Sequence, residues 1–130
     1  MMKSKTLSIS IKADPKKVYA FASNLENLPK LAKAFCRSIK KAEGDWIIES
    51  AQGPLKVRIT PPNPFGILDH TVLPPGAPEV FVPMRVVAND EGSEVFFTLF
   101  RRPEMTDVQY AEDERLVGLD LAGLKTAMEK

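Results

Sequence analysis

The sequence predicts an α+β fold in which an antiparallel sheet of seven strands packs against one long C-terminal helix. Apolar and polar residues alternate at a period of two in several segments, which is typical of strands with one buried face. The strands are joined by short connections, and a parallel link would need a crossover of a dozen or more residues. The final segment, Thr106 to Lys130, instead has apolar residues at helical spacing, so we expect it to cover the apolar face of the sheet.

The first part of the chain predicts one strand and then two short helices. Residues 5–13 alternate apolar and polar side chains, which predicts the first strand. Asp14 is a suitable N-cap and Pro15 suits the first helical position, so a short helix should run to about residue 24. Pro29 gives a second start signal and predicts another short helix over residues 28–35.

Turns rich in glycine and proline delimit six further strands and allow their register to be predicted. The turn signals lie at residues 43–45, 52–54, 61–66, 74–78 and 89–92. Closing the last of these turns with Ala88 opposite Ser93 pairs Val86 with Val95, Met84 with Phe97 and Val82 with Leu99. Centring the 74–78 loop on Gly76 pairs Val72 with Val80, His70 with Val82 and Leu68 with Met84. Pro83 cannot donate to a strand ladder, so a bulge or distortion is expected there.

The C-terminal helix begins with a capping box formed by Thr106 and Gln109. One face of the helix carries Tyr110, Asp113, Glu114, Val117, Leu121, Leu124 and Met128. The C-terminal half of this face is apolar and is expected to pack on the sheet. The N-terminal half carries a phenol and two carboxylates, which indicates a wetter environment.

Composition excludes several classes of function. The 130 residues predict a single domain over 1–130, and a net charge of +1 gives no support to nucleic-acid binding. No segment is apolar enough for secretion or membrane insertion, and the lone Cys36 suits a reducing compartment, so a cytoplasmic location is expected. One histidine and one cysteine in separate regions do not make a metal site, and no cofactor-binding motif occurs.

The order of elements resembles the helix-grip fold of the START-like (SRPBCC) superfamily. The segments His70-Thr71-Val72, 84–87 and 92–101 and the start of the last helix resemble bacterial members labelled polyketide cyclase or dehydrase-like. The resemblance implies a sheet curved around the long helix, with a cavity between them for lipids, sterols, polyketides or other apolar molecules. It also implies that the two short helices close one end of that cavity.

His70 is the candidate acid or base, because it is the single histidine and the predicted register places it on the inner face. Asp113 or Tyr110 would be its partner on the helix. The alternatives are a core histidine bonded to the helix and a surface residue. The predicted ligand contacts are Trp46, Ile48, Val57, Ile59, Val82, Met84, Phe97 and Val117, and the alternative is that they form an ordinary core.

The preferred function is binding of a small hydrophobic ligand in this cavity. One alternative is an enzyme of the cyclase or dehydratase type that uses His70, and another is a cochaperone-like interaction protein. Four apolar side chains are predicted to lie away from the core and suggest a homodimer: Phe96, Phe100, Leu116 and Leu119.

Overall fold

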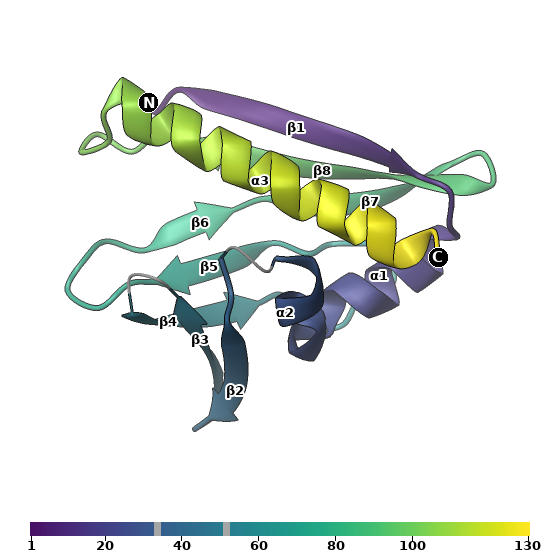
Figure 1. The fold of residues 1–130 in the computed structure, drawn as a ribbon, viewed down its shortest axis with the longest axis horizontal. Coiled ribbons are helices and arrows are strands. Elements are labelled where there is room, and N and C mark those ends of the chain that lie inside the picture. The colour runs from purple at the N-terminus through teal and green to yellow at the C-terminus, as the bar shows by residue number, and fades with distance from the viewer. Residues whose placement is uncertain (33–34, 51–52) are drawn as a thin grey trace.

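A long C-terminal helix, α3 (Asp107–Met128), lies along one of two antiparallel sheets (Figure 1). The computed structural model describes residues 1–32, 35–50 and 53–130. One sheet has the strand order β1 (Ser4–Ile11), β8 (Gly92–Phe100), β7 (Met84–Asn89). The other has the order β2 (Ser38–Ala42), β3 (Asp45–Ser50), β4 (Gly53–Ile59), β5 (His70–Leu73), β6 (Val80–Val82).

The helices between β1 and β2 confirm the prediction in part. Helix α1 (Pro15–Ser23) is capped as expected, because a side-chain oxygen of Asp14 accepts a hydrogen bond from the Lys16 amide at 2.7 Å. A short 3-10 helix, η1 (Leu25–Asn27), leads into α2 (Leu28–Leu31). The prediction of a helix over 28–35 is wrong in length, because the backbone at Ala32 leaves the helical conformation. Residues 33 and 34 lie outside the described part of the chain.

Most of the predicted register is confirmed. Val86 lies opposite Val95 and Met84 opposite Phe97 in the β7–β8 ladder, which ends there and does not include the predicted pair of Val82 with Leu99. On the other sheet, His70 lies opposite Val82 and Val72 opposite Val80. The 43–45 turn is also confirmed, and Glu43 and Gly44 adopt φ angles of 52° and 85°. Of the turn predicted at 52–54, Gly53 and Pro54 belong to β4 and Gln52 is outside the described residues.

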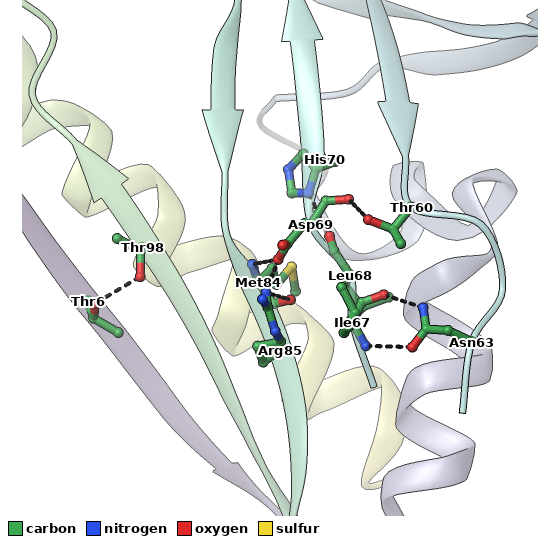
Figure 2. A network of polar contacts seen from close by, with 10 residues as sticks. All are labelled: Thr6, Thr60, Asn63, Ile67, Leu68, Asp69, His70, Met84, Arg85 and Thr98. Atoms are coloured by element: carbon green, nitrogen blue, oxygen red, sulfur yellow. Dashed lines mark hydrogen bonds and ion pairs between the residues drawn. The ribbon is translucent and has the colours of Figure 1, made fainter. Parts of the chain in front are cut away.

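The prediction of one seven-stranded sheet is wrong, because Pro83 divides the expected sixth strand into β6 and β7. Proline has no amide hydrogen to donate to a ladder. The next amide, that of Met84, donates to a carboxylate oxygen of Asp69 at 2.8 Å. The same oxygen also forms an ion pair with the Arg85 guanidinium (Figure 2). A side chain of the strand opposite therefore replaces part of the missing ladder.

Helix α3 begins with the predicted capping box. The Thr106 hydroxyl accepts from the Gln109 amide at 3.1 Å, and the Gln109 side chain accepts from the Thr106 amide at 2.9 Å. The helix packs against β1, β8 and α2. At Gly123 the α3 backbone approaches α2 so closely that a Cβ atom would collide with the Leu31 carbonyl oxygen. The main core lies between α3 and the three-stranded sheet and contains Ile11, Val18, Leu68, Val86, Val95, Val117, Leu121 and Leu124.

Candidate functional site

A cavity of about 270 Å³ lies between α3, the short helices and the inner faces of both sheets. Its walls come from α1, η1 and α2 at one end, from strands β3 to β8 along one side, and from α3 along the other. The lining residues are apolar except for three, His70, Asp113 and Asp120. Mostly apolar walls with a few polar groups are typical of small-molecule sites, and this volume is close to the lower end of their range.

Seven of the eight predicted ligand contacts line this cavity: Ile48, Val57, Ile59, Val82, Met84, Phe97 and Val117. They share one face because the ladders place Ile59 and Val82 on either side of His70. The eighth, Trp46, is not a lining residue. Its ring instead lies 5.8 Å from the Lys41 ammonium, at the partly exposed edge of a second core cluster, which is built on Leu25, Cys36, Ile48 and Val57.

The structure places the His70 ring at the cavity wall with one nitrogen occupied. Its Nδ1 lies 3.0 Å from the Leu68 carbonyl oxygen, which can only accept, so Nδ1 carries the proton (Figure 2). The ring also makes an edge contact with Phe97, with centroids 6.0 Å apart. Burial lowers the pKa of His70 from its ordinary value of 6.5, because the imidazolium loses its hydration. Near neutral pH the ring is therefore neutral, and Nε2 carries a lone pair that can accept a hydrogen bond.

Two carboxylates of α3, Asp113 and Asp120, reach the same cavity. Burial raises the pKa of Asp120 from 3.8 to about 7. Burial also raises the pKa of Asp113, against the opposing charge of Arg102. Within the described residues, Asp120 has no hydrogen bond or ion pair. The sequence interpretation missed Asp120, although a spacing of seven residues places it within about 20° of Asp113 on the helix.

Tyr110 and Glu114 do not join this group. The Tyr110 hydroxyl donates to the Leu99 carbonyl oxygen at 3.1 Å, and the side chain is buried outside the cavity lining. Glu114 forms an ion pair with Lys5 at 2.7 Å on the surface. The structure therefore brings together His70 and Asp113 of the predicted acid–base set, while Tyr110 serves the packing of α3 on β8.

The remaining candidate residues have simpler environments. Cys36 is buried in the second core cluster, and burial raises the pKa of its thiol. In the part of the chain that the structure describes, no group of three or more His, Cys, Asp or Glu side chains could hold a metal ion. Of the apolar residues predicted to lie away from the core, Leu119 is exposed, whereas Leu116 lines the cavity, so its assignment to an outer surface is wrong.

No described helix is long and apolar enough to span a membrane.

The fold is similar to that of several solved structures. The Aha1 dimer from Colwellia psychrerythraea has a TM-score of 0.80 at 20% identity, covering 98% of this chain and 97% of that one. The protein XoxI from Bacillus cereus has a TM-score of 0.78 at 19% identity, covering 98% and 96%. The di-domain ARO/CYC StfQ from the steffimycin biosynthetic pathway has a TM-score of 0.73 at 14% identity, covering 96% of this chain and 44% of that one.

No protein-family model matches the chain, and no curated protein matches its sequence. These similarities show the fold alone, and they agree with the architecture that the sequence resemblance implied, an antiparallel sheet packed against a long C-terminal helix.

Proposed function

We propose that the protein binds a small, mostly apolar molecule in the cavity between α3 and the sheets. The observation that carries this proposal is the lining itself, which is apolar apart from His70, Asp113 and Asp120. Such walls favour an apolar body because its transfer from water is favourable, and the three polar groups can orient it. Ligand-binding proteins occur among helix-grip folds, which supports the same reading.

A pair of leucines on α3 allows a matched test. Leu116 lines the cavity, whereas Leu119 lies on the same helix with 51% of its side chain exposed. In Leu116→Trp the indole should fill part of the cavity and weaken binding of 2-methylnaphthalene at least tenfold. Leu119→Trp should leave that affinity unchanged. Fluorescence titration measures both, and equal affinities in the two variants would contradict binding in this cavity.

The identity of a natural ligand is a separate measurement. Native mass spectrometry of the protein purified from its own host should show a retained mass that is lost on denaturation. The same mass should be absent from Leu116→Trp and present in Leu119→Trp, because only the first substitution reduces the cavity. A retained mass that is equally abundant in both variants would indicate binding elsewhere on the protein.

A second candidate function is an enzyme of the cyclase or dehydratase type. It is favoured by three titratable groups around one apolar cavity and by the fold similarity to the ARO/CYC protein StfQ. The free Nε2 of His70 would act as the base, with Asp113 or Asp120 supplying or receiving a proton. Incubation of the recovered ligand with the protein, followed by mass spectrometry, should show conversion that His70→Gln abolishes while binding persists. Unchanged ligand would leave carriage as the function.

Self-association remains a separate proposal, now without Leu116. Phe96 and Phe100 of β8 are partly exposed and belong to neither core cluster. Leu119 is exposed on α3, and the similar Aha1 structure is described as a dimer. Size-exclusion chromatography with light scattering should show a dimer at micromolar concentration, and Leu119→Lys should shift it to monomer. A monomer before the substitution would dispose of the homodimer. A cochaperone-like role stays a prediction from the sequence resemblance.

A further inference from the structure

We propose that the cavity selects apolar ligands that carry an amine, and that it excludes apolar carboxylates. This inference rests on the proposed function, and it adds the chemical class of the ligand.

The cavity offers hydrogen-bond acceptors and no cationic donor. Among the described lining residues there is no lysine or arginine, and the polar ones are His70, Asp113 and Asp120. The Nδ1 proton of His70 is already donated to the Leu68 carbonyl oxygen, which leaves Nε2 as an acceptor. Ionised aspartates only accept. A carboxylate ligand would therefore meet no counterion in this lining, and its charge would further disfavour ionisation of the two aspartates.

Among the residues that the structure describes, none of opposite charge pairs with Asp120. It lies between apolar neighbours on α3, with Val117 and Leu121 packed into the core and Leu116 in the cavity wall. A half-buried carboxylate without a counterion is disfavoured, and Asp120 reduces that cost by keeping a proton at pH values where a solvated aspartate has lost it. A ligand ammonium would supply the missing counterion.

Few titratable or charged side chains lie around the described cavity lining. Helix α3 contributes the two titratable lining groups Asp113 and Asp120. The charge of Arg102, in the segment before the helix, lowers the pKa of Asp113, and the charge of Glu112 raises it. Strand β5 contributes one titratable lining group, His70. The lining residues that come from α1, η1, α2, β3, β4, β6, β7 and β8 are apolar. Seven residues of helix separate Asp113 from Asp120, about 10 Å along the axis of α3, so one ammonium can pair with one of these two carboxylates at a time.

The test uses four probes with one aromatic body: 2-naphthylmethylamine, 2-naphthylmethanol, 2-naphthoate and 2-methylnaphthalene. Isothermal titration calorimetry at pH 7 should give the highest affinity for the amine, at least tenfold above the alcohol, with the carboxylate weakest. Amine binding should release protons, because the ammonium favours ionised Asp120. Titrations in two buffers of different ionisation enthalpy measure this release.

Variants separate the carboxylate from the cavity. Asp120→Asn should lower the affinity for the amine about tenfold, remove the proton release, and change the affinity for 2-methylnaphthalene less than twofold. Asp113→Asn provides a second carboxylate variant with the same expected direction. Asp90→Asn, in the exposed β7–β8 turn, should change neither affinity. Retained binding of 2-methylnaphthalene also shows that each variant is folded.

The outcomes distinguish this inference from the proposed function. If 2-methylnaphthalene binds and the alcohol or carboxylate binds as tightly as the amine, amine selection is wrong and cavity binding stands. If the amine binds best but neither Asp120→Asn nor Asp113→Asn weakens it, the assignment to these carboxylates is overturned. If none of the four probes binds, the proposed cavity binding fails and amine selection fails with it.

Discussion

The two sheets meet the long helix differently. The β1–β8–β7 sheet packs directly on α3, and side chains from both sides interdigitate in the main core. The sheet of β2 to β6 has its own smaller core, built on Leu25, Cys36, Ile48 and Val57, and four of its strands, β3 to β6, line the cavity together with the ends of β7 and β8. Both sheets have an apolar inner face. The comparison teaches that an apolar face becomes core only where another element fills the space against it.

The largest effect is expected from a substitution in the main core, and it can be compared with the same substitution at the cavity wall. Ile11 is 2% exposed in the main core, whereas Ile59 lies at the cavity wall. Ile11→Ala should lower the free energy of unfolding by about 2–5 kcal/mol, because it leaves a void in packed surroundings. Ile59→Ala should cost about 1 kcal/mol, since part of its side chain already faces a cavity. Urea denaturation measures both, and equal losses would show that the two sides are packed alike.

Two glycines of α3 sharpen the contrast on the helix itself. At Gly123 a Cβ atom would collide with the Leu31 carbonyl oxygen of α2, while at Gly118 it would meet nothing within 4 Å. Gly118→Ala should stabilise the protein by about 0.5–1 kcal/mol through helix propensity. Gly123→Ala should destabilise it by about 1–2 kcal/mol despite the same gain. Thermal denaturation of the pair tests whether α2 is held against α3, and stabilisation by both substitutions would contradict that contact.

The third comparison concerns Asp120 at the cavity wall. Its pKa is about 7 when folded and ordinarily 3.8, so the folded state holds a proton that the unfolded state has lost between about pH 4 and pH 7. Stability should therefore fall as pH rises through this window. The Asp120→Asn variant lacks that contribution. Its free energy of unfolding relative to the parent should therefore rise by about 1–2 kcal/mol between pH 4 and pH 8. The difference between the two proteins cancels the opposite contribution of His70.

Chemical denaturation at pH 4, 6 and 8 measures this difference. Asp90→Asn serves as the matched control, because residue 90 is exposed in a turn away from the cavity. A constant difference between Asp120→Asn and the parent across these pH values would show that the aspartate is solvated and that the cavity is open to water.

Local patterns were sufficient to predict much of the fold. The turns at 43–45 and 89–92 fixed which residues lie opposite each other, and the period of two then placed every other side chain on the inner face. The capping box at Thr106 and the N-cap at Asp14 were predictable because each depends on residues within one turn. The cytoplasmic location and the single domain stay predictions.

What the sequence did not predict depends on contacts between distant segments. Pro83 indicated a distortion, but the hydrogen bond from the Met84 amide to the Asp69 side chain joins residues 15 positions apart and has no local signal. Tyr110 lies on the correct face, yet its hydroxyl is used by Leu99. Asp120 was missed because the helix was treated as apolar beyond Val117, although its spacing from Asp113 was visible in the sequence. The position of α3 determines which residues of the inner sheet faces line the cavity.

Cys36 offers a reporter at the end of the molecule where α2 meets β2. It is the single cysteine of the chain, it is buried, and its neighbours in the second core cluster include two cavity-lining residues, Leu25 and Ile48. A thiol reagent reaches it only when this end opens, because burial both shields the sulfur and disfavours the reactive thiolate. The rate of labelling in the native protein therefore measures how often the short helices part from the sheet, and a bound ligand that holds them closed would slow it.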